Sequence, residues 1–203
     1  MKPEFGADLS NVLLRQSQII HTRMAGRAVI RVVNRCNEAM EDSNLNLSEC
    51  QLVTVPDAVY HLLRNTTLVS CNLACNVISK ISPKFATKFS CITELNLSNN
   101  KMSRLPDEMS ECGQLEKLDV SHNSFVDIPQ VVFRLPKIRV LLVNNNYIID
   151  VDVKQLPKDS PIEEVDLREN PLLPDCHEML SQVTSVKVLL SPRVKEDWED
   201  LDV

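Results

Sequence analysis

The stretch Ile92–Pro106, "ITELNLSNNKMSRLP", spaces its apolar residues in a way that neither a helix nor a simple strand uses. Leu95 and Leu97 bracket a short strand and point to one side, alternating with Asn96. The chain must turn after this strand, and Asn100 carries both a donor and an acceptor for backbone groups left inside the turn. The stretch therefore predicts one coil of a stacked structure, in which the asparagine bonds within and between coils.

The same pattern recurs along the chain. Its asparagines stand at positions 76, 100, 123, 146 and 170, so the spacings are 24, 23, 23 and 24 residues. The other copies are Leu68–Ile81, Leu115–Pro129, Ile138–Val151 and Ile162–Leu173, with a degenerate first copy at Leu45–Pro56. That first copy has Cys50 where asparagine is expected, and a thiol is only a weak donor. We therefore expect Cys50 to lie in an end coil.

This pattern resembles the leucine-rich repeat, L-x-x-L-x-L-x-x-N/C-x-L. The trailing pairs Leu105-Pro106 and Ile128-Pro129 resemble the intracellular LPxx type of that family. The resemblance implies an α/β solenoid, right-handed and curved, with a parallel sheet on its concave side and a helical cap at its N-terminal end. Six coils would cover about residues 42–174, and stacking would bury one continuous core.

The predicted organisation has four parts. Residues 1–23 form an N-terminal arm, either a short helix or a mobile segment, and residues 24–41 form the cap helix. Residues 42–190 form the repeat domain, which consists of six repeats and a C-terminal cap strand within Val186–Pro192. Residues 191–203 form an acidic tail that contains the one tryptophan.

The predicted cap helix is amphipathic. Its apolar positions at helical spacing are Val29, Val32 or Val33, Cys36 and Met40, and its basic positions are Arg27, Arg31 and Arg35. One interpretation is a cap whose apolar side covers the first coil. The other is a basic amphipathic helix for a membrane surface or for mitochondrial targeting.

Composition narrows the functional classes. The net charge is -6, and the first forty residues are basic, so the remainder is strongly acidic and disfavours non-specific nucleic-acid binding. The seven cysteines form no C-x-x-C pair, which argues against a disulfide framework and a zinc site. No apolar run reaches signal-peptide or membrane-spanning length. We expect a monomer in the cytoplasm, or in the nucleus, that does not bind membranes.

Enzymatic signals are weak. The four histidines are scattered, and the adjacent residues Asp175, Cys176 and His177 do not make a catalytic site by adjacency alone. We expect no catalytic residues, no metal and no cofactor. The expected function is non-catalytic binding of another protein, as a scaffold or adaptor. The alternative is a regulatory subunit that docks on a phosphatase, a ubiquitin ligase or a small GTPase.

The predicted binding surface consists of the variable positions beside the strand leucines, which face outward on the concave side. Val140 and Leu142 form an apolar pair on this otherwise polar strip. Asp119, Glu164 and Asp166 flank them and predict a pocket for an apolar side chain beside a lysine or arginine of the partner. The remaining predicted contact residues are Glu94, Asn96, Lys117, His122, Asn144 and Arg168.

The acidic tail offers a second predicted contact, through Trp198 and Leu201. The segment "DWEDL" resembles the W-x-x-L motif read by autophagy ubiquitin-like modifiers and the acidic tryptophan motifs bound by kinesin light chains. The terminal Leu201-x-Val203 resembles a weak PDZ ligand, which binds by strand addition. Alternatively, Trp198 packs against the last coil.

Overall fold

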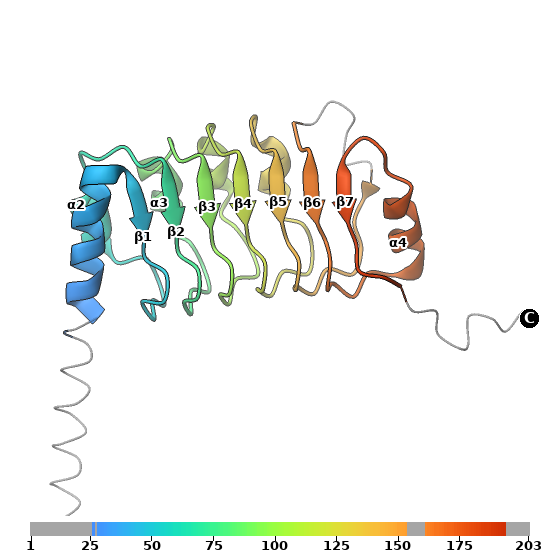
Figure 1. Ribbon diagram of the computed structural model, residues 1–203, viewed down its shortest axis with the longest axis horizontal. Helices are drawn as coiled ribbons and strands as arrows, with labels where there is room; N and C mark the ends of the chain where they lie inside the picture. The colour runs from blue at the N-terminus through green and yellow to red at the C-terminus, as the bar shows by residue number, and fades with distance from the viewer. Residues whose placement is uncertain (1–25, 27, 154–160, 194–203) are drawn as a thin grey trace, which may run out of the picture.

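The computed structural model describes residues 26, 28–153 and 161–193. Seven short strands stack side by side in chain order and form a single parallel sheet (Figure 1). The strands are β1 (Asn44–Asn46), β2 (Ser70–Asn72), β3 (Glu94–Asn96), β4 (Lys117–Asp119), β5 (Val140–Leu142), β6 (Glu164–Asp166) and β7 (Lys187–Leu189). This architecture confirms the predicted α/β solenoid.

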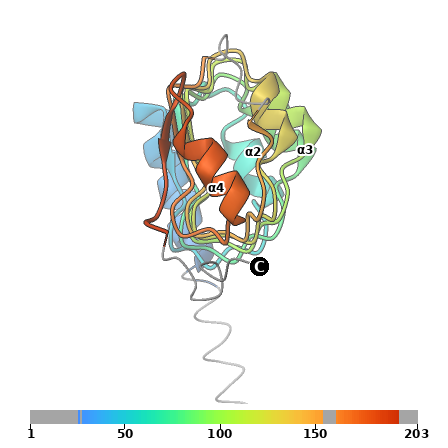
Figure 2. The same cartoon turned by 90° about the vertical axis from the view of Figure 1, so that its right-hand side faces the viewer.

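The register of the sheet is uniform. The middle residues of neighbouring strands face one another along the whole sheet, for example Leu95 beside Leu118 and Leu118 beside Leu141. Helical segments lie behind the sheet and form the opposite wall of the coil (Figure 2). These segments are the α-helices α2 (Asp57–Leu62) and α3 (Pro83–Lys88) and the 3₁₀ helices η1 (Asp107–Glu111) and η2 (Gln130–Arg134).

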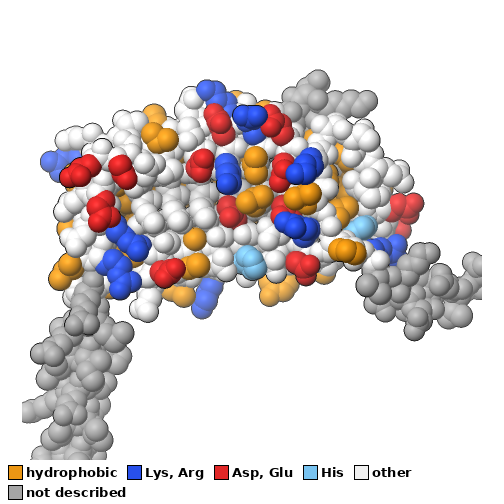
Figure 3. All heavy atoms as spheres, in the orientation of Figure 1, with side chains coloured by type: hydrophobic (Ala, Val, Ile, Leu, Met, Phe, Trp, Pro, Cys, Tyr) orange, Lys and Arg blue, Asp and Glu red, His pale blue; other side chains and the backbone are white. Residues whose placement is uncertain are grey.

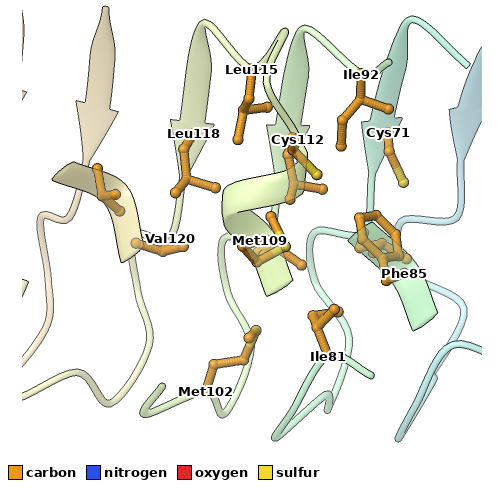
Figure 4. Close-up of a cluster of buried hydrophobic side chains, with 14 of the residues drawn as sticks. Cys71, Ile81, Phe85, Ile92, Met102, Met109, Cys112, Leu115, Leu118 and Val120 are labelled. Carbon is orange, nitrogen blue, oxygen red and sulfur yellow. The ribbon is translucent and has the colours of Figure 1, made fainter. Parts of the chain in front are cut away.

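The core fills the space between the sheet and this outer wall. Leu118 from the sheet strand β4, and Phe85 from α3 and Met109 from η1 on the helical wall, are fully buried and point toward one another (Figure 4). Each coil contributes only a few such side chains, so its neighbours must complete the burial. The apolar spacing of the repeat is therefore the spacing of inward-facing positions around one coil.

The predicted asparagine ladder is confirmed by its hydrogen bonds. The Asn100 amide nitrogen donates to Leu97 O in its own coil and to Leu73 O in the preceding coil, both at 3.0 Å. Its amide oxygen accepts from Ile78 N of the preceding coil at 3.0 Å. The same arrangement recurs at Asn76, Asn123, Asn146 and Asn170. One side chain per coil thus pairs buried backbone groups that would otherwise be unsatisfied.

The cap helix has helical backbone over residues 28–42. Val32, Cys36 and Ala39, which are spaced i, i+4 and i+7, are its buried residues. The predicted apolar stripe was partly wrong, because Val29 is 63% exposed and Met40 is 43% exposed. Met40 follows Ala39 by one residue, which turns its side chain about 100° away from the buried stripe.

The basic side of this helix contacts the first coil. Arg35 Nη1 donates to Ser48 O and to Cys50 Sγ, the latter at 3.3 Å, and Arg31 Nη1 donates to Glu49 O at 3.1 Å. Ser48 O is the carbonyl two residues before the ladder position, and the ladder asparagine serves this carbonyl in later coils, as Asn100 does for Ser98 O. Arg35 therefore supplies the donor that Cys50 lacks. These contacts favour the cap interpretation over a membrane helix.

The C-terminal end contains a helix that the repeat pattern did not predict. Helix α4 (Pro174–Ser181) lies between β6 and β7, begins at a proline and buries Cys176 and Leu180. His177 Nε2 lies 2.9 Å from Ser191 O, and Val151 N donates to Cys176 Sγ at 3.3 Å. The neighbours Cys176 and His177 thus make separate structural contacts.

Candidate functional site: the concave face of the sheet

The concave face changes character along the sheet. Figure 3 looks onto this face, and the area over β1–β3 is mostly white, whereas charged and apolar side chains gather over the later strands and charged ones also lie at the N-terminal edge. We call the face of β1–β3 the amide half and the face of β4–β7 the charged half. The first strand residue is Asn44, Ser70 and Glu94 in the amide half, and Lys117, Val140, Glu164 and Lys187 in the charged half.

In most strands, the side chain of the third residue accepts a hydrogen bond that closes the following turn. The Asn96 side-chain oxygen accepts from Ser98 N at 2.9 Å, and the Asp119 carboxylate accepts from Ser121 N at 2.9 Å. The equivalent residues Asn46, Asn72 and Asp166 make the same bond to the N–H two residues further on. Each bond closes a turn in which the side chain satisfies a backbone donor at the end of its strand.

Leu142 interrupts this row inside the sheet, and Leu189 in the last strand, β7, also departs from it. Leu142 occupies the third position of β5, in register with Asp119 on one side and Asp166 on the other. A leucine side chain cannot accept a hydrogen bond, so β5 lacks the turn-closing bond of its neighbours. Leu142 and Val140 are both half-buried, and their remaining surface is apolar area on a polar face. Neither of them belongs to the partly buried apolar side chains that pack against the core of the described residues.

Ion pairs within the chain lie beside the apolar pair, on the side of β6. Lys187 Nζ lies 2.8 Å from Glu164 Oε2, and Arg168 Nη2 lies 2.6 Å from Asp166 Oδ2. Two of the three carboxylates that were expected to receive a partner's cation are therefore already neutralised by this chain. Asp119 remains, because only one of its two oxygens accepts a hydrogen bond from Ser121.

The structure removes Asp166 from the predicted contact surface, since this residue is only 4% exposed. Burial alone would raise the pKa of the Asp166 carboxyl, but the hydrogen bonds and the positive charge of Arg168 outweigh it and lower the pKa. Asp166 is therefore a charged structural residue, and Arg168, which is exposed, covers it.

The sequence interpretation missed a row of residues that stand just before the strands. Arg139 and Glu163 form a two-bond ion pair, with Nε–Oε1 at 2.8 Å and Nη2–Oε2 at 2.9 Å. Together with Glu116 and Val140 they help to line an open hollow of about 280 Å³. The signal was present, because these positions directly follow the first leucine or isoleucine of the repeat and hence also flank the sheet.

The other predicted residues lie on the same face or outside the described residues. Glu94, Lys117 and Arg168 are exposed, and Asn96 and Asn144 are half-buried. His122 is exposed and has a left-handed backbone with φ of 52°, like the residue before every other ladder position. Trp198 and Leu201 lie outside the described residues.

Comparison with known proteins agrees with this architecture. A family model described as "Leucine rich repeat" matches residues 66–125. Leucine-rich repeat-containing protein 20 of Mus musculus is 34% identical over 174 residues, which cover 84% of this chain and 95% of that protein. The Homo sapiens protein of the same name is 34% identical over 171 residues, or 82% and 93% of the two chains.

The chain belongs to the leucine-rich repeat family. Among solved structures, a leucine-rich repeat protein of Leptospira interrogans has a TM-score of 0.60 at 27% identity, over 71% of this chain and 36% of that one. An internalin from Listeria monocytogenes has a TM-score of 0.52 at 22% identity, over 68% and 40% of the two chains, and shows the fold alone. Leucine-rich repeat proteins generally mediate protein–protein interactions, and this repeat presents the face described above.

Proposed function

We propose that this leucine-rich repeat protein is a non-catalytic adaptor inside the cell, and that a partner protein docks on the charged half of its concave face. The observation that carries the proposal is Leu142, which gives up the turn-closing bond and leaves apolar surface beside Val140. An apolar pair with no role in the fold, set among charges, is typical of the centre of a binding surface.

Among the described residues, no group of three or more histidine, cysteine, aspartate or glutamate side chains is arranged to hold a metal ion. Among the described helices, none combines the length and the apolar character needed to cross a bilayer. The cysteines are what supports the intracellular part of the proposal. All seven cysteines are free thiols, and five of them are buried, which suits a reducing compartment.

The apolar pair should contribute modestly to the binding free energy, but enough to change the affinity for a partner measurably. Full burial of a valine or leucine side chain stabilises an interface by about 1.5–3 kcal/mol. Both side chains are already half-buried, so we expect about half that contribution from each. Because 1.4 kcal/mol corresponds to about tenfold in affinity, their loss should weaken a partner by one to two orders of magnitude.

The test compares partner capture by the full chain and by three variants. Leu142→Glu places a charge at the proposed centre, and Leu142→Asn restores the polar residue that neighbouring coils use. Val126→Asn is the matched control, because it removes an aliphatic side chain that is 55% exposed and lies outside the strands. Quantitative mass spectrometry of affinity-purified material gives the readout.

We expect both Leu142 variants to lose the same partners and the control to keep them. Identical partners from all four proteins would exclude the charged half as the docking surface. A single stoichiometric enzyme among the Leu142-dependent partners would indicate a regulatory subunit, whereas several substoichiometric partners would indicate an adaptor.

A further inference from the structure

The amide half carries three carboxamides whose orientation is fixed. Asn46, Asn72 and Asn96 are in register on adjacent strands. Their oxygens accept from backbone N–H groups at 3.1, 3.0 and 2.9 Å. Because only the oxygen of a carboxamide can accept, each amide nitrogen must face away from the turn that its oxygen serves.

These three nitrogens present hydrogen-bond donors that the protein does not use. Among the described residues, none of the three amide nitrogens donates to an acceptor within the chain, in contrast to the buried ladder asparagines, whose nitrogens are fully engaged. Asn46, Asn72 and Asn96 line an open hollow of about 330 Å³ on the face. The hollow therefore offers a row of uncharged donors with spare capacity.

The electrostatics of the hollow select the kind of acceptor. Glu94 is the charged residue in its lining, and it is exposed. A carboxylate of a ligand would meet repulsion from Glu94. Neutral acceptors, above all main-chain carbonyl oxygens, meet no such penalty. A helix keeps most of its carbonyls engaged internally, whereas an extended segment leaves them unpaired.

We propose that the partner docks through an extended segment that lies across the strands. Its main-chain carbonyls accept from Asn46, Asn72 and Asn96, and one apolar side chain sits on Val140 and Leu142. This inference rests on the proposed function and adds the conformation of the ligand. Strands lie about 4.8 Å apart, so β1 to β5 span about 19 Å, which an extended chain crosses in about six residues.

Replacing asparagine by aspartate removes the outward-facing N–H donor but keeps the oxygen that accepts from the backbone. Asp119 shows that an aspartate closes the same turn through one oxygen. The double variant Asn72→Asp/Asn96→Asp should therefore fold normally while two donors become carboxylate oxygens that repel carbonyls. The double variant Ser79→Asp/Ser103→Asp is the control, because it adds the same charge at exposed positions outside the strands. Thermal unfolding of all variants verifies that they fold.

The probe is a displayed library of random twelve-residue peptides that lacks aspartate and glutamate, selected on the full chain. We expect enriched peptides with one required apolar residue and no i, i+4 apolar repeat. Their binding should fall at least tenfold on Asn72→Asp/Asn96→Asp, about three- to tenfold on Leu142→Asn, and less than twofold on the control.

Each other result overturns a defined part of the proposal. Peptides that need Leu142 but bind the double aspartate variant unchanged, or that bind as amphipathic helices, overturn the extended ligand and leave the proposed function standing. Peptides that ignore Leu142→Asn overturn the proposed docking centre. Failure to enrich any peptide on the parent chain overturns both.

Discussion

The two halves of the concave face rest on the same scaffold but present different chemistry. In both halves a leucine or valine, or in β2 a cysteine, occupies the middle of each strand and is buried in β1–β6 and half-buried in β7, and a ladder asparagine pairs the backbone between coils. The amide half then exposes asparagine and serine, whereas the charged half exposes ion pairs and the apolar pair Val140 and Leu142. Inward positions are thus constrained by packing, and outward positions are free to vary with function.

The difference is clearest at the third strand position, because the outward-facing residue there also closes a turn with its side chain. Asn46, Asn72, Asn96 and Asp119 each close that turn, whereas Leu142 inside the sheet and Leu189 in the end strand do not. A departure at such a position costs the fold a hydrogen bond, so it indicates a gain elsewhere. A variable outward residue without any duty would give a weaker indication.

The first and largest expected effect concerns the ladder that both halves share. Asn123→Ala should destabilise the protein by about 1–3 kcal/mol, because it leaves buried backbone groups unpaired on two coils. Asn170→Ala should cost less, since Asn170 is only half-buried near the end of the ladder. Denaturant titration of both variants measures the difference. Unchanged stability of Asn123→Ala would contradict the role of the ladder.

The second effect concerns the start of the amide half, where Arg35 replaces the missing asparagine. Arg35→Ala should destabilise by about 1–2 kcal/mol, because a charged donor to Ser48 O is lost at a partly exposed site. Cys50→Asn in that background should recover part of the loss. The chemical denaturation of the two single variants and the double variant gives the coupling. If the changes in the free energy of unfolding are additive, Arg35 and residue 50 do not serve the same carbonyl group.

The third effect exchanges the two halves at one position. Leu142→Asn adds a turn-closing acceptor to β5 and should stabilise by up to about 1 kcal/mol, whereas Asn72→Leu removes one from β2 and should destabilise by a similar amount. Thermal and urea unfolding of the two variants provide the test. Destabilisation by Leu142→Asn would mean that the fold needs this leucine, which would remove the main argument for a binding role.

The smallest effect depends on pH and is confined to the charged half. The lowered pKa of Asp166 stabilises the folded chain above the unfolded value of about 3.9, and this stabilisation disappears as pH falls through the lower, folded value. Asp166→Asn should therefore cost less than about 1 kcal/mol near pH 7, because Arg168 is largely exposed, and still less near pH 3. Urea titrations at both pH values check the trend. A cost that grows on acidification would contradict this sign.

The repeat spacing was sufficient to predict the coils and the ladder, because both depend on residues that every coil repeats. Asn100 and Leu95 could be assigned from one copy and verified in the next. The Arg35 contact could not be predicted, since it depends on where a helix outside the repeat meets Cys50. Helix α4 was missed because the repeat pattern breaks at Asn170–Asp175, although the helix lies between β6 and β7 as α2 lies between β1 and β2.

Only part of the candidate site could be predicted from the sequence. The periodicity identified Val140 and Leu142 as outward-facing, and their half-exposure follows from that position. Periodicity does not show which charges pair, so Glu164 and Asp166 seemed open to a partner although Lys187 and Arg168 already neutralise them. Pairing depends on side-chain reach within a coil, as for Arg168 and Asp166, and between coils, as for Lys187 and Glu164.

Site-specific photo-crosslinking tests the central claim most directly. A photoreactive amino acid is placed in the full chain at Val140, at Ser70 in the amide half, and at the exposed Lys88 of α3 on the opposite wall. We predict that positions 140 and 70 give an adduct with the same partner and that position 88 gives none. An adduct from position 88 alone would contradict docking on the concave face.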